Sequence, residues 1–273
     1  MTIEELIIYG KKYLHKEEVK LLLEFITGFD ALELQNHLKE VVTSDEEKKF
    51  KELILARKNN YPLQYILGDV NFYGLRIKVN KNVLIPRFET EELTENTIKI
   101  IKEKFKNKDN LKILDLCTGS GAIGLKLKSV FKNAKVTLSD ISELALKVAK
   151  ENSESLGLDV EIIQGDLFEN IKEKYDVIIS NPPYIMEDEE IEGIVRENEP
   201  SIALFAGKDG LYFYKKILKS IRSYLNDEFI IAFEIGQTQK DAVTNLAKES
   251  LKDVNIYSKK DLQNKDRMIF IIK

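Results

Sequence analysis

The sequence predicts an α/β fold, in which an open parallel sheet is flanked by helices and is preceded by a small helical bundle and a linking β-hairpin. After residue 110, seven apolar strand-like segments alternate with helical patterns, and the early segments are continuous apolar runs. Such runs are typical of strands that are covered by helices on both faces. The first 60 residues show helical periodicity instead, and the period changes near Asn71.

Helix start signals organise the first 60 residues. Three pairs have the spacing of a capping box, in which a side-chain oxygen and an acid three positions later satisfy free N–H groups. The pairs are Thr2 with Glu5, Asp30 with Glu33, and Ser44 with Glu47. Apolar residues follow each pair at helical period, so we expect a helical domain over residues 1–70. This pattern fits a structural cap and a substrate-recognition module equally well.

A strand-and-turn segment links this domain to the rest of the chain. Apolar and basic residues alternate over residues 75–79, directly after Gly74, which indicates a β-hairpin. Pro86 ends the pattern, so residues 71–88 form the predicted linker and residues 89–273 the predicted second domain. The elements expected there are a helix over Glu89–Phe105 and strands over Lys112–Leu116, Lys135–Leu138, Val160–Ile163, Asp176–Ile179, Phe229–Glu234, Val254–Tyr257 and Met268–Ile272.

Composition narrows the functional classes. The chain has 273 residues, 43% of them hydrophobic, so it can fold around a sizeable core. There are 42 Lys and Arg against 46 Asp and Glu, and the net charge of −4 argues against strong non-specific nucleic-acid binding, which needs a basic face. The single cysteine, Cys117, excludes an intramolecular disulfide and a Cys-based zinc site.

The ends and the histidines of the chain add further expectations. Acidic residues follow Met1 where a signal peptide carries positive charge, and no apolar run reaches the roughly 18 residues of a membrane span. We therefore expect a cytoplasmic protein, monomeric by default, without a metal and without direct binding to nucleic acid or membranes. His15 and His37 both lie in the first 40 residues, so catalysis in the second domain has to proceed without imidazole.

A glycine-rich loop follows the first strand of the second domain. Gly119, Gly121 and Gly124 form a G-x-G-x-x-G pattern, in which glycine permits positive φ and lets a ligand approach the backbone. Asp115 lies four positions before the loop, where its carboxylate could meet an ammonium group. Asp140 follows Gly119 by 21 residues, a spacing at which an acid reaches a ribose diol. Structural alternatives are a helix cap for Asp140 and a solvated strand-end acid for Asp115.

A third acidic position follows the third strand of this domain. Asp166 could accept a hydrogen bond from an exocyclic amine, and Leu167 and Phe168 could form an apolar wall for a purine, although Phe168 fits a core position equally well. Up to this point the pattern resembles the class I S-adenosylmethionine-dependent methyltransferases. Residues 115–121 look like the first motif of that family and Asp140 looks like its second. This resemblance implies S-adenosyl-L-methionine as the cofactor and S-adenosyl-L-homocysteine as its product.

The fourth strand runs into the tetrapeptide Asn181-Pro182-Pro183-Tyr184. Consecutive prolines fix φ and remove two N–H donors. The Asn181 side chain and the Pro182 carbonyl could then accept both hydrogens of one planar –NH2 group, while Tyr184 packs against its face. Such a nitrogen is a poor nucleophile, so orienting its lone pair and stabilising the positive charge that develops on it are what catalysis needs. The alternative is a turn that simply terminates the strand.

Further segments are similar to the release factor glutamine methyltransferase family over essentially the whole chain. They are residues 62–68, 72–75, 83–91, 199–207, 209–211, 234–236 and 266–267, together with the Asn-Pro-Pro-Tyr tetrapeptide. Phe88 departs from the family's pattern, which has a proline there, and Leu167 stands where some members carry a tryptophan. The resemblance implies a Rossmann-like methyltransferase sheet of seven strands with the last one antiparallel, and an N-terminal lobe that helps to hold the substrate.

The same resemblance implies the reaction and its residues. The substrate would be the glutamine of the Gly-Gly-Gln motif of class 1 peptide chain release factors, methylated at its side-chain amide nitrogen. We expect Asn181, Pro182 and Tyr184 to be catalytic and Asn181 to contact the cofactor as well. The remaining assignments are Thr118, Gly119, Ser120, Gly121 and Ala122 at the methionine end of the cofactor, Asp140 at its ribose, and Asn181, Pro182, Pro183 and Tyr184 at the substrate glutamine.

Three alternatives and one ambiguity stay open at this point. The same tetrapeptide serves adenine-N6 methyltransferases of DNA and RNA, against which the acidic composition argues. A dinucleotide-dependent oxidoreductase would use the glycine loop but leaves the tetrapeptide unexplained. A binding module without transfer activity would not need Asn181. Finally, Arg87 and Glu89 could steer the partner or form a surface ion pair.

Overall fold

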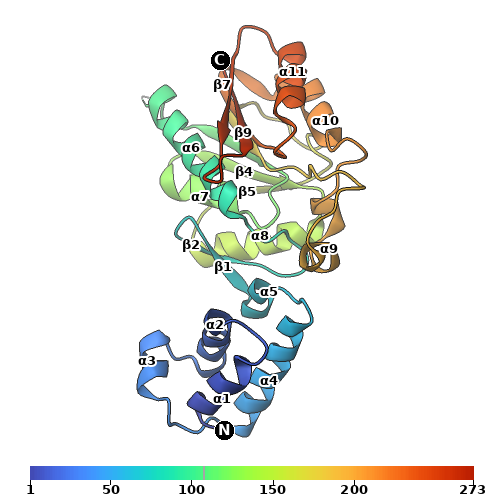
Figure 1. Ribbon diagram of the computed structural model, residues 1–273. Coiled ribbons are helices and arrows are strands. Elements are labelled where there is room, and N and C mark those ends of the chain that lie inside the picture. Colours follow the sequence, from blue (N-terminus) through green and yellow to red (C-terminus); the bar gives the residue numbers. More distant parts are fainter. Residues whose placement is uncertain (107) are drawn as a thin grey trace. The chain divides into compact units, whose positions relative to one another are not determined.

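The computed structural model describes residues 1–106 and 108–273, and the chain separates into two compact units (Figure 1). The N-terminal unit comprises residues 1–69 and 191–198, and the sheet unit comprises residues 70–190 and 199–273. Within the described ranges, no helix combines the length and the apolarity that a crossing of a lipid bilayer requires.

The N-terminal unit is helical. Its apolar helix faces meet in one cluster, in which Leu6, Leu22 and Phe50 are completely buried and contribute the hydrophobic stabilisation of the unit. Its helices are α1 (Ile3–Gly10), α2 (Lys16–Thr27), α3 (Ala31–Asn36), α4 (Ser44–Lys58), α5 (Leu63–Leu67) and α9 (Gly193–Asn198).

Capping interactions define where these helices begin. The predicted capping boxes at Thr2 and Asp30 are confirmed. The third prediction is wrong by one residue: Thr43 caps α4, and the Glu46 carboxylate accepts the Thr43 backbone N–H at 2.7 Å. The spacing fits both registers, but the Glu47 carboxylate is engaged elsewhere, by the N-terminal ammonium group and by Lys51.

The linking hairpin consists of β1 (Asp69–Phe72) and β2 (Leu75–Lys78), which pair as a two-stranded sheet. Tyr73 and Gly74 have φ of 46° and 82° at its tip. Positive φ at both central residues is the conformation of a tight hairpin turn, and glycine adopts it without steric cost. The sequence cue at Gly74 therefore has a direct structural basis.

The sheet unit contains a seven-stranded sheet of order β5-β4-β3-β6-β7-β9-β8. All strands run parallel except β9, which is antiparallel to both neighbours, so the expected antiparallel last strand is confirmed. The strands are β3 (Lys112–Leu116), β4 (Lys135–Asp140), β5 (Glu161–Gln164), β6 (Tyr175–Ser180), β7 (Leu225–Glu234), β8 (Asn255–Lys260) and β9 (Asp266–Ile272).

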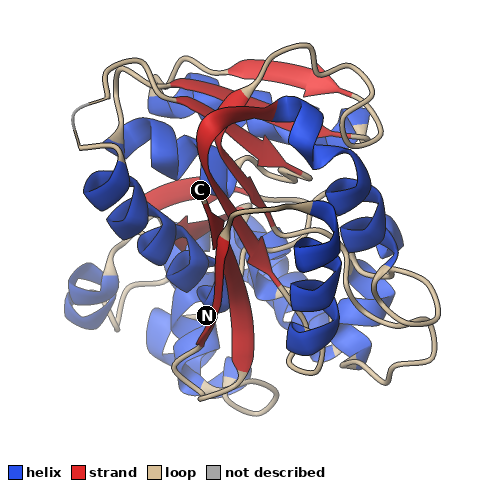
Figure 2. Cartoon of the chain, turned by 90° about the horizontal axis from the view of Figure 1, so that it is seen from above, coloured by secondary structure: helices blue, strands red, loops and turns tan. Residues whose placement is uncertain are grey.

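Helices lie against both faces of this sheet (Figure 2). The residues of β3, β6, β7 and β9 that point to one face pack with Tyr214, Ile217 and Val243 of the helices that cover it. This is why the early strands read as continuous apolar runs. The helices of the unit are α6 (Phe88–Lys104), α7 (Ala122–Val130), α8 (Glu143–Leu156), α10 (Tyr212–Ser220) and α11 (Lys240–Ser250), with 3₁₀ turns η1 (Ser201–Ala203) and η2 (Ile221–Tyr224).

The order of the strands places a switch point at the centre of the sheet. The chain proceeds from β3 outward through β4 to β5 and then returns to β6 on the other side of β3. Leu116 at the end of β3 is level with Ser139 and Ser180 on its two neighbours. Ligands of open α/β sheets bind in the crevice outside the carboxyl ends at such a point, so the loops after these strands form the candidate site.

Candidate active site at the carboxyl edge of the sheet

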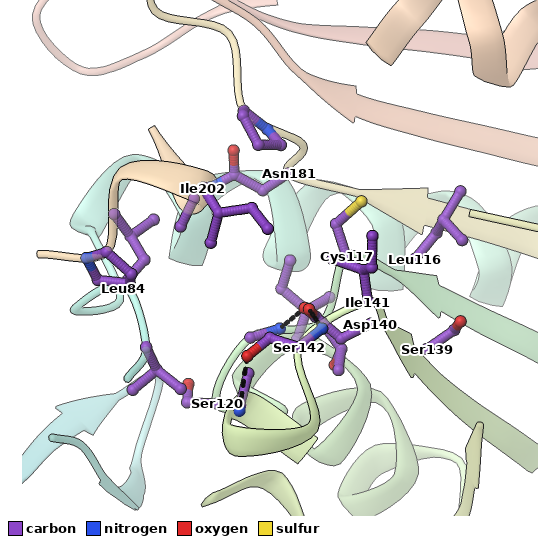
Figure 3. Close-up of a pocket in the computed structure, with 18 of the residues that line it drawn as sticks. Leu84, Leu116, Cys117, Ser120, Ser139, Asp140, Ile141, Ser142, Asn181 and Ile202 are labelled. Carbon is purple, nitrogen blue, oxygen red and sulfur yellow. Dashed lines mark hydrogen bonds between the residues drawn. The ribbon is translucent and has the colours of Figure 1, made fainter. Parts of the chain in front are cut away.

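A cavity of about 1020 Å³, part of it open to solvent, lies at this edge of the sheet unit (Figure 3). It is lined by the glycine loop, the end of β4, the loop after β5 and the start of the tetrapeptide. Further lining residues come from two other segments: Asn82, Val83, Leu84 and Pro86, and Pro200, Ile202 and Ala203. Its size is that of a small-molecule site. Of the predicted site residues it brings together Thr118, Gly119, Ser120, Ala122, Asp140, Asp166, Leu167, Asn181 and Pro183.

Asp115 supports the glycine loop from beneath. Its Oδ2 accepts hydrogen bonds from the Thr118 hydroxyl at 2.5 Å and from the Gly124 backbone N–H at 2.8 Å. The side chain is completely buried and does not line the cavity, and burial raises the pKa of the carboxyl group to about 6. The expectation that Asp115 meets a ligand's ammonium group directly is therefore corrected: the strand end points its carboxylate into the loop.

The glycines of the loop serve two different purposes. Gly119 and Gly121 have φ of 56° and 83°, a region in which glycine is favoured. Gly119 lines the cavity, and a Cβ built there would meet nothing within 4 Å. Gly124 is required by packing, because a Cβ would stand 2.1 Å from Leu138 Cδ2. Gly119 therefore keeps the cavity wall open, whereas Gly124 lets α7 approach the sheet.

Asp140 joins the glycine loop to the start of α8. Its Oδ2 accepts from the Gly119 N–H and its Oδ1 from the Ser142 N–H, both at 2.9 Å (Figure 3). Ser142, and not Asp140, is the N-cap of α8. Burial raises the pKa of the Asp140 carboxyl group, although backbone hydrogen bonds from Ser142, Gly119 and Ile141 oppose the shift. The Ile141 backbone N–H also contributes a hydrogen bond to this carboxylate. Two carboxylate oxygens have about four lone-pair sites, so the group can still accept from a ligand at the cavity wall.

The loop after β5 contributes two of its three predicted residues. Asp166 and Leu167 line the cavity, and the Lys216 ammonium group donates to Asp166 Oδ2 at 2.6 Å. Phe168 does not line it; its ring stacks on Tyr224 at a centroid distance of 4.4 Å within the core. The expected purine wall at Phe168 is therefore corrected to a core position, and Leu167 remains on the cavity side.

The tetrapeptide presents one polar side chain to the cavity. Asn181 Nδ2 donates to Thr90 Oγ1 at 3.1 Å, and no hydrogen bond among the described residues engages Asn181 Oδ1. Pro183 also lines the cavity, whereas Pro182 and Tyr184 lie beside it without lining it. The Tyr184 backbone carbonyl accepts from Gln239 at 2.8 Å, which fixes the far end of the tetrapeptide.

Glu234 lies behind the tetrapeptide at the end of β7. It is 1% exposed and accepts from the Thr90 hydroxyl at 2.6 Å and from the Tyr184 hydroxyl at 3.2 Å. Burial raises the pKa of its carboxyl group to about 7, opposed by these two hydrogen bonds and by the Arg267 charge. The same burial raises the pKa of Tyr184 far above its ordinary value.

An ion pair lies next to two of the segments that line the cavity. Arg87 pairs with the buried Glu199, whose second oxygen accepts the Ile85 backbone N–H at 3.1 Å. Arg87 follows the segment 82–86 and Glu199 precedes the segment 200–203, so the pair links the two segments, which both contribute residues to the cavity lining. Arg87 therefore forms an ion pair, but with a buried partner and not at the surface, and the steering of a partner protein by Arg87 and Glu89 stays a prediction.

Sequence reasoning did not single out several residues of this site by role. Thr90, Glu199 and Glu234 appear in the sequence only within longer family-like segments, and their partners lie 91 to 144 positions away. Cys117, Ser139 and Ile141, which line the cavity, carry no sequence signal beyond their position at strand ends. Among the described residues, no three His, Cys, Asp or Glu side chains form a group that could hold a metal ion.

Comparisons with known proteins add two independent findings. Family models described as "PrmC N-terminal domain" and "Methyltransferase small domain" match residues 6–68 and 89–198. The chain is similar to the release factor glutamine methyltransferases of Bacillus subtilis, 38% identical over 98% of this chain and 96% of the relative, and of Streptococcus pneumoniae, 39% identical over 98% and 94%.

The fold is also similar to a solved structure, that of the T. thermophilus 16S rRNA methyltransferase RsmC in complex with AdoMet and guanosine. The TM-score is 0.54 at 14% identity, and the match covers 75% of this chain and 49% of that chain. At this identity the likeness extends to the fold and no further.

Proposed function

Because the chain belongs to the release factor glutamine methyltransferase family, we propose that it methylates the side-chain amide nitrogen of the glutamine in the Gly-Gly-Gln motif of class 1 peptide chain release factors. The methyl group comes from S-adenosyl-L-methionine. The observation that supports this proposal most directly is Asn181, whose amide nitrogen donates to Thr90 while its oxygen, at the cavity wall, has no partner among residues 1–106 and 108–273.

The residues of the cavity fit S-adenosyl-L-methionine. Asp140 offers carboxylate oxygens to the ribose hydroxyls, and Asp166 offers an acceptor to the adenine amine. Ile141 and Leu167 supply apolar surface beside them. The open side of Gly119 leaves room for the methionine end along residues 118–122. Asp115 contributes by holding this loop. When bound, the cofactor supplies an electrophilic methyl group on a sulfonium.

The chain's own residues then have to orient a weak nucleophile. The lone pair of an amide nitrogen is delocalised, so the enzyme gains most by holding both N–H bonds and by stabilising positive charge as it develops on nitrogen. Asn181 Oδ1 accepts one N–H, and the Pro182 carbonyl, whose residue has no N–H of its own to offer, accepts the other. Tyr184 packs beside them and is held by Glu234 and Gln239. As the nitrogen gains the methyl group it loses one of its two protons, which passes to water, so this step needs no histidine.

Each segment of the chain has a proposed role. We propose residues 1–70 as the domain that recognises the release factor, residues 71–88 as the linker and residues 89–273 as the methyltransferase domain. The enzyme acts as a monomer in the cytoplasm and needs no direct nucleic-acid contact.

A labelling experiment tests the proposal. The chain is incubated with tritiated S-adenosyl-L-methionine and one of three substrates: a class 1 release factor, the same factor with the motif glutamine changed to alanine, or total RNA and DNA. We expect label in the unmodified factor alone. Label confined to nucleic acid, or equal label in the alanine variant of the factor, would reject it.

A further inference from the structure

A chain of three buried or half-buried polar groups runs from the end of β7 to the cavity wall. It starts at the Glu234 carboxylate, passes through the Thr90 hydroxyl and ends at the Asn181 amide. We propose that Glu234 and Thr90 are positioning residues for methyl transfer, which fix the Asn181 side chain with its oxygen toward the substrate. This inference rests on the proposed function only in that the substrate nitrogen needs an acceptor there.

The number of protons that each group carries sets the direction of the hydrogen bonds from Asn181 through Thr90 to Glu234. A hydroxyl group has a single proton to donate, and a carboxylate can only accept. Thr90 lies 2.6 Å from Glu234 Oε2, so its proton is committed to Glu234. Thr90 Oγ1 can then only accept from Asn181, 3.1 Å away, and only the –NH2 end of the amide can donate. Asn181 Oδ1 is left for the cavity.

An asparagine without such a neighbour would present either end. The two ends of an amide have nearly the same shape, so its orientation is set by hydrogen bonds. An –NH2 end turned toward the cavity would face the N–H bonds of the substrate, donor against donor. The ionised Glu234 carboxylate can only accept hydrogen bonds, and it is linked to Asn181 by two hydrogen bonds through Thr90. It therefore sets which end of the Asn181 amide faces the substrate.

Glu234 also holds the other end of the tetrapeptide, because its Oε1 accepts the Tyr184 hydroxyl at 3.2 Å. One buried carboxylate thus ties Asn181 and Tyr184 to the same point. The charged groups that face it are Arg267 on β9, which favours its ionised form, and Glu89 on α6, which opposes it. The Tyr214 hydroxyl donates to the backbone carbonyl of Glu234 at 2.6 Å and leaves the carboxylate oxygens to the two hydroxyls above.

Protonation of Glu234 would reverse the donor and acceptor roles in both hydrogen bonds. A protonated carboxyl group can donate to Thr90, whose own proton is then released toward Asn181, and the amide has to turn its oxygen inward to accept it. Acidification through the titration of Glu234 should therefore lower the rate of transfer without emptying the cofactor site, which uses other residues.

Nuclear magnetic resonance of the side-chain amides tests the hydrogen bonds between Asn181, Thr90 and Glu234 without any substrate. In protein labelled with ¹⁵N-asparagine, the Asn181 –NH2 resonances are followed between about pH 5.5 and 8.5 in the parent and in three variants. Thr90→Val removes the hydroxyl at nearly constant shape, and Thr90→Ser keeps it. Thr97→Val is the matched control, because Thr97 is also fully buried on α6 but donates to the Leu93 carbonyl at 2.7 Å.

We expect the Asn181 resonances to titrate in the parent, in Thr90→Ser and in Thr97→Val, and to be displaced and insensitive to pH in Thr90→Val. Glu234→Gln should abolish the titration as well. Unchanged Asn181 resonances in Thr90→Val, or a titration that persists in Glu234→Gln, would overturn the proposal.

Single-turnover kinetics supply the second readout. Thr90→Val should lower the rate of transfer about tenfold, the effect of one neutral hydrogen bond, while Thr90→Ser stays within about twofold of the parent. The dissociation constant for S-adenosyl-L-homocysteine should not change in either variant. Equal rates for Thr90→Val and the parent would contradict the inference. If the parent itself modifies no release factor, the proposed function fails, and the resonance experiment still decides the role of Thr90 and Glu234.

Discussion

Replacing Asn181 with alanine removes the acceptor that we propose for catalysis and one further hydrogen bond. Its Oδ1 has no partner among the described residues, and its Nδ2 makes one hydrogen bond, to Thr90 at 3.1 Å. Loss of one positioned acceptor in a transition state costs about 2.7–4 kcal/mol, so we expect the rate of methyl transfer to fall roughly 10²- to 10³-fold. The lost Thr90 hydrogen bond is a neutral one and should cost about 0.5–1.5 kcal/mol of folding stability. The variant should therefore stay folded.

The assay is single-turnover transfer from saturating S-adenosyl-L-methionine to a release factor, with calorimetric titration of S-adenosyl-L-homocysteine alongside. Asn226→Ala is the matched control: Asn226 Nδ2 also makes one hydrogen bond, to Asp176 at 2.6 Å, but at the amino edge of the sheet. We expect parental rates for the control and unchanged ligand affinity for both variants. A rate for Asn181→Ala within about twofold of the control would refute the role of this side chain.

Three further predictions concern the scaffold of the site. Glu199→Ala should lower the free energy of unfolding, measured in urea, by about 1.5–3 kcal/mol, because Arg87 and the Ile85 backbone N–H lose their buried acceptor. The control Glu95→Ala breaks an exposed ion pair with Lys99 and should lower the same free energy by less than about 0.5 kcal/mol. Gly124→Ala should weaken S-adenosyl-L-homocysteine binding at least about tenfold in calorimetry, since its Cβ would overlap the sheet and displace the loop. Because burial raises the pKa of Glu234 from 4.5 to about 7, the folded state keeps a proton that the unfolded state has lost between these values. Stability relative to Glu234→Gln should thus decrease by roughly 2–3 kcal/mol as the pH of the urea titration rises from about 4.5 to 7.5, and an increase would contradict the sign.

The sheet could be predicted because its signal is local. Strands β6, β7 and β9 carry runs of consecutive apolar residues, and β3 begins and ends where the pattern predicts. The differences lie where a strand leaves the core: β7 begins at Leu225 and not at Phe229, because residues 226–228 are partly or fully exposed and polar, and so give no apolar signal. Leu225 pairs with Tyr175 of β6 ahead of a register shift, and such pairing cannot be read from periodicity.

The site could be predicted where its residues follow strand ends, and not where it depends on pairing across the chain. Asp140 and Asn181 reach the cavity because parallel strands bring their carboxyl ends to one edge. Asp115 and Phe168 have the expected types and positions but point into the loop and the core, a matter of side-chain direction that spacing does not fix. Glu234 is missed as an individual residue because its partner Thr90 lies 144 positions away.

Asn181 and Pro182 are proposed to hold a carboxamide nitrogen next to the methyl donor. A crystal structure with S-adenosyl-L-homocysteine and a peptide that contains Gly-Gly-Gln measures this directly. We predict the glutamine amide nitrogen within hydrogen-bond distance, about 2.7–3.2 Å, of both Asn181 Oδ1 and the Pro182 carbonyl oxygen, with the sulfur on the open side of that nitrogen. A glutamine bound elsewhere, or Asn181 with its –NH2 end toward the peptide, would contradict the account.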